Sequence, residues 1–161
     1  MKKIDYTKLF ISIVGTQLAG VIGSVFNFAS IPTWYMTLEK PSFNPPNWVF
    51  GPVWTILFLM MGVAVYLVWT KKTMFHQKKK KEALQIFVLQ LLLNILWSAI
   101  FFGLLSPAWA FVEIMFLWLA ISLTMVKFYK FSNWAAYLLI PYLAWVSFAV
   151  VLNFAIWRLN W

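Results

Sequence analysis

Residues 84–126, LQIFVLQLLLNILWSAIFFGLLSPAWAFVEIMFLWLAISLTMV, carry a single charged side chain, that of Glu113. Because a bilayer core about 30 Å thick requires about 20 apolar helical residues, this stretch is long enough for two membrane spans. Ser106 and Pro107 interrupt it, and these residue types suit a helix cap and the first turn of a helix. The stretch therefore predicts two antiparallel transmembrane helices joined by a tight turn.

The remainder of the chain contains three more apolar runs of similar length. With 63% hydrophobic and 11% charged residues, the 161-residue chain has too little polar surface for an ordinary soluble domain. We therefore expect an all-α polytopic membrane protein, a bundle of five transmembrane helices forming a single domain over residues 1–161. The predicted spans are about 9–28, 49–69, 84–105, 108–126 and 134–157.

Basic residues are distributed unevenly between the two predicted sides of the membrane. Eleven of the 13 Lys and Arg residues lie in the amino-terminal segment and in the connections after the second and fourth spans. Lys40 and Arg158 alone lie on the other side. This asymmetry predicts a cytoplasmic amino terminus and an external carboxyl terminus. The net charge of +9 is then explained by topology and contact with the lipid bilayer, and we expect no nucleic-acid partner.

Three predicted helices carry aromatic or amide side chains at helical spacing. Amides are costly against lipid, so those of Gln90, Asn94 and Asn153 should face the interior, where they can bond other helices or a ligand. Aromatic walls with a few amides suit a large, flat, mostly apolar ligand. The inward sets are Trp54, Phe58 and Met61; Gln90, Asn94, Trp97 and Phe101; and Trp145, Ala149 and Asn153.

Charged and catalytic groups are sparse within the spans. Glu113 lies six residues beyond Pro107, about 9 Å along a helix, so we expect it to reach the headgroup region or to form a structural pair, with a functional role as the alternative. His76 has no neighbouring ligand residue and the chain has no cysteine, so no metal site is expected. Pro141, inside the fifth span, predicts a kink there.

The connection at 29–47 is long, aromatic and rich in proline, which is typical of a functional loop. Pro45 and Pro46 favour extended backbone, and Gly51 and Pro52 can occupy the opening turn of the next helix. We expect a rigid lid over a cavity, with Trp54 beneath it. The alternative is a stiff helix start with an interfacial tryptophan.

Three runs resemble the TspO/MBR family of translocator (peripheral benzodiazepine receptor) and tryptophan-rich sensory proteins. They are PTWYMTLEKPSFNPPNWVFGPVW from Pro32, LLLNILWSAIFFG from Leu91 and PYLAWVSFAVVLN from Pro141. The likeness extends through all five spans, and its segment WYMTLEKPSFNPP is unusually specific.

The resemblance implies a five-helix bundle, usually a homodimer, with a cavity beneath the first loop. It implies binding of porphyrins such as protoporphyrin IX, as ligand or substrate, and of benzodiazepine or isoquinoline carboxamide compounds, with no required cofactor. Trp54 and Trp145 resemble the tryptophans implicated in light-dependent porphyrin degradation. The predicted ligand-binding residues are Tyr35, Trp54, Phe58, Gln90, Asn94, Trp97, Trp145 and Ala149.

Two departures from the family pattern narrow these expectations. Phe154 and Ala155 stand where a tyrosine-based sterol pattern would lie, which argues against cholesterol as ligand. Ala83 is followed four residues later by Phe87, so the small-residue dimer motif is missing. Besides porphyrin binding and degradation, a porphyrin or lipid transporter and a stress sensor acting through a protein partner remain alternatives. Five spans exclude two equal inverted halves, which weakens the transporter hypothesis.

Overall fold

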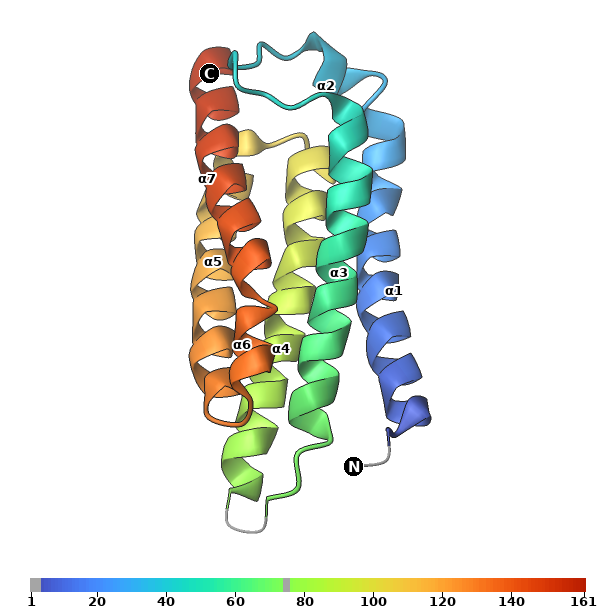
Figure 1. Cartoon of the computed structure of the whole chain (residues 1–161). Coiled ribbons are helices and arrows are strands. Elements are labelled where there is room, and N and C mark those ends of the chain that lie inside the picture. The colour runs from blue at the N-terminus through green and yellow to red at the C-terminus, as the bar shows by residue number, and fades with distance from the viewer. Residues whose placement is uncertain (1–3, 74–75) are drawn as a thin grey trace.

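A computed structural model of the chain describes residues 4–73 and 76–161, which form helices joined by short connections (Figure 1). Lys2 and Lys3, which contribute to the predicted charge asymmetry, lie outside these residues. The elements are α1 (Tyr6–Ser30), α2 (Trp34–Thr37), α3 (Asn47–Trp69), α4 (Gln77–Ser98), the π-helical turn η1 (Ala99–Gly103), α5 (Pro107–Tyr129), α6 (Asn133–Tyr137) and α7 (Ile140–Asn160).

Five membrane-length segments make up the bundle. Within the described residues, α1, α3, α4 with η1, α5, and α6 with α7 are each long and apolar enough to cross a bilayer. The predicted all-α bundle of five transmembrane helices is confirmed, and the protein is an integral membrane protein. Figure 1 shows α2 and the carboxyl terminus at one end of the bundle, and the amino-terminal part of α1 with the α3–α4 connection at the other.

The turn between the third and fourth spans is as tight as the sequence predicts. Pro107 begins α5. A backbone N–H at this position has no intrahelical partner, so its absence from proline costs the helix no hydrogen bond. Ser106 precedes it, but its hydroxyl makes no capping hydrogen bond. Leu105 adopts a left-handed φ of 52°, which costs a non-glycine residue about 1–2 kcal/mol. This one strained residue lets α4 and α5 run side by side.

Two prolines lie elsewhere in their helices than predicted. Pro141 falls in the first turn of α7, because the fifth span is already broken at Leu138 and Leu139. The fifth span is thus interrupted next to Pro141, but the interruption lies just before the proline, between α6 and α7, and not within α7. Pro52 is the sixth residue of α3 rather than part of its opening turn, because the helix begins at Asn47.

The end of the bundle opposite α2 carries most of the lysines and is called the basic end below. Its core is packed by side chains of α3, α4, α5 and α7. The Phe87 ring of α4 stacks on Phe128 of α5, with centroids 5.5 Å apart. Ala83 is fully buried on the same face of α4. Ala83 and Phe87, which stand where the small-residue dimer motif would lie, therefore pack within the bundle. Gly62 lets α1 approach α3, because a Cβ there would lie 2.8 Å from the Cα of Ile13.

A buried hydrogen-bond relay joins α4 to α7. The fully buried Tyr142 hydroxyl donates to Gln90 Oε1 at 2.8 Å and accepts from Asn94 Nδ2 at 3.1 Å. Gln90 Nε2 also contacts Met61 Sδ of α3 at 3.8 Å. Since lipid offers no partner to these amides, their pairing fixes the register of α4 against α7.

A second interhelical link lies nearer the end of the bundle that carries α2. Trp97 Nε1 donates to Asn153 Oδ1 at 3.0 Å, and Asn153 Nδ2 donates to the carbonyl oxygen of Pro107 at 2.8 Å. One amide thus connects α4, α7 and the start of α5. The inward faces predicted for Gln90, Asn94 and Asn153 are those that the structure shows.

Replacing Tyr142 by phenylalanine should destabilise the protein. The variant removes one hydroxyl and leaves Gln90 Oε1 and Asn94 Nδ2 without the partner that Tyr142 supplies, at a cost of about 1–2 kcal/mol. Thermal unfolding in detergent should show a lower Tm for Tyr142→Phe. Tyr6→Phe, at a side chain that is 74% exposed, is the matched control and should leave the Tm unchanged. Equal Tm values for both variants would contradict a structural role for the relay.

Candidate functional site

A partly open cavity of about 310 Å³ lies in the half of the bundle near α2, bordered by α1, α3, α4, η1 and α7. The largest side chains of its wall are aromatic, and amide groups from several helices lie among them. Because large aromatic rings supply broad, flat apolar contacts, this lining suits a planar molecule. The aromatic residues that line it are Tyr35, Phe50, Trp54, Phe58, Trp97, Phe101, Phe102 and Trp145.

Most of the predicted ligand-binding residues lie around this one cavity. The exception is Gln90, which does not line it. Gln90 lies one helical turn from Asn94 toward the basic end of the bundle, where its side chain is 1% exposed and bonds Tyr142 and Met61. Its amide is therefore part of the interhelical relay. The residues that line the cavity are Tyr35, Trp54, Phe58, Asn94, Trp97, Trp145 and Ala149.

The two tryptophans predicted to take part in porphyrin chemistry come from different helices. Trp54 of α3 packs against Phe58, with centroids 5.5 Å apart, and edge-on against Tyr142 at 6.2 Å. Trp145 of α7 meets Phe50 edge-on at 5.8 Å. Both indoles are held by neighbouring rings and still line the cavity.

Residues 31–46 form a cap over this end of the bundle, and Tyr35 points its buried ring inward from it. The Tyr35 hydroxyl donates to Asn44 Oδ1 at 3.2 Å, within the cap itself. Burial raises the pKa of the Tyr35 phenol, so the hydroxyl keeps its proton and remains a donor at neutral pH. Lys40 Nζ lies 4.6 Å from the Tyr35 ring centroid and adds a cation–π contact.

The cap is fastened to the last turn of α7 by a reciprocal pair of hydrogen bonds. The backbone N–H of Glu39 donates to Asn160 Oδ1 at 2.9 Å, and Asn160 Nδ2 donates to the Glu39 carbonyl at 2.9 Å. One side-chain amide therefore pairs both backbone groups of a loop residue, much as a neighbouring strand does. This attachment agrees with the rigid lid predicted for the loop.

Several lining residues were not among the predicted ligand-binding residues. Phe101 was predicted to face inward, because it follows Trp97 at a helical step of four, but it was not assigned to the ligand. Phe102 is brought to the same cavity by the π-helical turn η1, which a regular period of 3.6 does not predict. Gly20 of α1 lets the Phe58 ring lie against its backbone, because a Cβ at Gly20 would be 2.6 Å from that ring.

Asn27 of α1 contributes an unused hydrogen-bond acceptor to the lining. Its Oδ1 atom is buried and has no hydrogen-bond partner among the residues that the structure describes. A buried acceptor without a partner costs free energy. A ligand bearing a donor group could remove that cost, so Asn27 is a candidate anchor that the aromatic pattern did not indicate.

The cavity reaches the bundle surface between α1 and α3. Val21, Gly51 and Thr55 line it and are also exposed on the outside of the bundle. Across this seam, Gln17 Nε2 donates to the carbonyl oxygen of Thr55 at 3.0 Å. In a bilayer the seam faces lipid, so an apolar molecule can reach the cavity from within the membrane.

Glu113 lies outside the cavity. Its side chain is 6% exposed beside a surface groove between α4 and α5, and neither carboxylate oxygen has a hydrogen-bond partner within residues 4–73 and 76–161. The structural pair expected for Glu113 is therefore not formed there. The described residues also hold no cluster of three or more His, Cys, Asp or Glu side chains that could bind a metal ion.

The fold and its cavity define a class: polytopic helical membrane proteins with a capped aromatic cavity. A model of the TspO/MBR family matches residues 12–158, and the chain belongs to this family. The resemblance found in the three sequence motifs is thus confirmed.

Similar proteins come from archaea, animals and bacteria. The tryptophan-rich protein TspO of Archaeoglobus fulgidus is 45% identical over 157 residues, which cover 98% of this chain and 99% of that protein. The translocator protein of Homo sapiens is 42% identical over 144 residues, covering 89% of this chain and 85% of that protein. The tryptophan-rich sensory protein of Cereibacter sphaeroides is 39% identical over 128 residues, with coverages of 80% and 77%.

Removing the amide that fastens the cap should loosen the cap without unfolding the bundle. Asn160→Ala deletes both bonds to Glu39, each worth about 1 kcal/mol, so amide exchange of residue 39 should accelerate about fivefold or more. Arg158→Gln, on the same turn of α7 and exposed, is the control. Hydrogen–deuterium exchange that is equal in both variants would show that Asn160 does not hold the cap.

Proposed function

We propose that the protein binds flat, mostly apolar aromatic molecules of the porphyrin class, such as protoporphyrin IX, in the capped cavity. The observation that carries this proposal is the convergence of aromatic side chains from α3, α4, η1, α7 and the cap on one site. Rings can stack on a macrocycle, and edge-on contacts such as Phe50 with Trp145 can hold its rim. Benzodiazepine and isoquinoline carboxamide compounds, which are also flat and aromatic, fit the same chemistry.

The size of the cavity bears on how a macrocycle is held. At about 310 Å³ it is at the small end of the roughly 300–1,000 Å³ range of ligand sites. A porphyrin therefore occupies the cavity together with the outer part of the seam between α1 and α3, where Gln17 Nε2 donates to the carbonyl oxygen of Thr55. Propionate groups can remain at the polar edge of the membrane while the ring plane lies among the aromatic side chains.

The broader role follows from the family. Relatives carry the names translocator protein and tryptophan-rich sensory protein, which support a translocator-type role at a membrane for this chain. The proposal includes a homodimer in a bacterial cell membrane, with the lysine-rich end in the cytoplasm and the cap outside. Porphyrin flux in proteoliposomes separates a transporter from a protein that only binds.

Narrowing the cavity should weaken binding while leaving the fold intact. Ala149→Leu adds three carbon atoms at a lining position, so protoporphyrin IX should bind about tenfold more weakly, a loss of about 1.4 kcal/mol. Ala155→Leu makes the same change on α7 away from the cavity and is the control. Saturable quenching of tryptophan fluorescence by protoporphyrin IX measures both.

Two results would overturn the binding proposal. One is an absence of saturable quenching in the wild-type protein. The other is equal affinity in Ala149→Leu and Ala155→Leu, which would place the ligand elsewhere.

A second candidate function is light-dependent oxidation of the bound porphyrin. It rests on the placement of two indoles, Trp54 and Trp145, in the lining of the same cavity. Dioxygen is the oxidant: both of its atoms add across one carbon–carbon double bond at a methine bridge, which becomes two carbonyl groups. The indoles act as one-electron relays between the photoexcited ring and dioxygen and return to their starting state.

Replacing both indoles tests this candidate separately from binding. The double variant Trp54→Phe/Trp145→Phe keeps aromatic walls but lacks the readily oxidised side chains, so illuminated porphyrin loss should fall to the rate of protein-free porphyrin. Binding should persist, and Trp109→Phe, at a side chain that is 70% exposed, should behave as the wild type. Unchanged loss under illumination, with binding intact, would eliminate the relay role.

A further inference from the structure

A second, open cleft of about 570 Å³ lies at the end of the bundle opposite the cap. It is formed by the first turns of α1, the end of α3 and the beginning of α4. Lys8, Lys80 and Lys81 line it, together with the indole of Trp69. Three ammonium groups beside a tryptophan at the end of membrane spans are an unusual lining, because like charges repel unless something compensates them.

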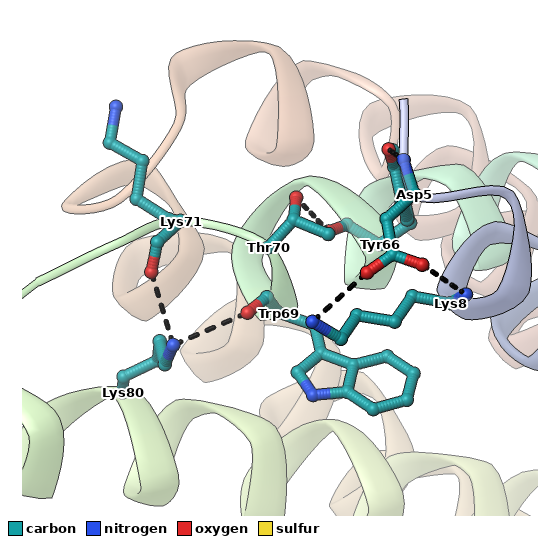
Figure 2. A network of polar contacts seen from close by, with 7 residues as sticks. All are labelled: Asp5, Lys8, Tyr66, Trp69, Thr70, Lys71 and Lys80. Atoms are coloured by element: carbon teal, nitrogen blue, oxygen red, sulfur yellow. Dashed lines mark hydrogen bonds and ion pairs between the residues drawn. The ribbon is translucent and has the colours of Figure 1, made fainter. Parts of the chain in front are cut away.

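The chain itself fixes two of these three lysines. Figure 2 shows Lys80 Nζ between two backbone carbonyls at the end of α3, 3.2 Å from that of Trp69 and 3.1 Å from that of Lys71. Lys8 Nζ lies 3.1 Å from the Asp5 carboxylate and 5.8 Å from the centroid of the Trp69 ring. These contacts hold both ammonium groups at the cleft before any ligand arrives.

The charge of the cleft is not neutralised within the described chain. Lys81 is exposed and makes no hydrogen bond or ion pair with any residue in 4–73 or 76–161. Asp5 is the single carboxylate paired to a lysine of the cleft. Glu82, the next nearest along α4, pairs with Lys127 of α5 at 3.5 Å instead. The cleft therefore retains a net positive charge and is complementary to an anion.

The part of the cleft nearer the membrane core is less charged. Leu84 and Val88 of α4 continue the lining beyond Lys81, at helical steps of three and four residues, and Gln85 lies beside them. Lys81 and Val88 are seven residues apart, about 10 Å along the helix axis. Val88 is 52% exposed on the bundle surface, within a span, where it meets lipid. The lining thus changes from cationic to uncharged along the direction that leads into the membrane.

We propose that this cleft is a binding site for one anionic phospholipid. Its headgroup phosphate lies among the ammonium groups of Lys8, Lys80 and Lys81, and one acyl chain follows Leu84 and Val88 along α4. Basic pockets between spans at a membrane surface have the charge needed to select anionic over zwitterionic lipids. The site is separate from the aromatic cavity and does not depend on the function proposed for it.

The experiment compares two pairs of charge-neutralising substitutions on the full-length protein. Lys8→Gln/Lys81→Gln removes two charges from the cleft, and Lys80 is retained because it binds the end of α3. Lys78→Gln/Lys79→Gln removes the same charge from exposed positions of α4 that do not line the cleft. Native mass spectrometry in a neutral detergent measures the affinity for dioleoyl phosphatidylglycerol, with dioleoyl phosphatidylcholine and glycerol phosphate as further probes.

The expected result is a loss confined to the cleft pair. Since a lysine near an anionic lipid surface contributes about fivefold, we expect about 25-fold weaker phosphatidylglycerol binding for Lys8→Gln/Lys81→Gln and little change for Lys78→Gln/Lys79→Gln. Equal losses in both pairs would show a diffuse charge effect and overturn the site. Equal binding of phosphatidylcholine would overturn the charge selection, and equally tight binding of glycerol phosphate would show a soluble-anion site instead.

Discussion

The hydroxyl of Tyr142 is the contact on which the arrangement of the bundle depends. Within a bilayer an amide finds no water, so Gln90 and Asn94 must meet partners inside the protein, and Tyr142 supplies a partner for both. The pairing permits one register of α4 against α7. Farther along the same helices, Trp97 of α4 and Asn153 of α7 form a second hydrogen bond, and Asn153 also bonds the start of α5. Asn94, Trp97 and Asn153 form these interhelical bonds and also line the aromatic cavity.

The membrane-spanning helices and most of the residues that line the cavity could be predicted from the sequence, because both follow from the length and the polarity that a bilayer requires of a helix. Span length predicts the five segments, and the helical period places Trp54, Trp97 and Trp145 inside. What it missed depends on local geometry. The π-helical turn that turns Phe102 inward breaks the period on which the prediction rests. Gln90 has the same inward pattern as Asn94, and only the position of Tyr142 shows that its amide bonds a neighbouring helix.

The two ends of the bundle have different chemistry and are fixed in different ways. At the capped end, Asn160 ties the loop to α7 through both backbone groups of Glu39. The seam between α1 and α3 is bridged by Gln17, which bonds the Thr55 carbonyl, and by the buried Thr16, which bonds the Phe58 carbonyl. At the other end, Lys80 binds the backbone carbonyls of Trp69, the last residue of α3, and of Lys71 just beyond it.

Hydrogen–deuterium exchange of the wild-type protein, with and without protoporphyrin IX in the dark, is the most direct test of a capped cavity that holds a flat ligand. A macrocycle in that cavity should slow exchange in residues 31–46 and in the halves of α1 and α3 that border it. Residues 76–88, at the basic end, should be unaffected. Unchanged exchange in the cap at saturating porphyrin, or protection confined to the basic end, would show that the aromatic cavity is not where such ligands bind.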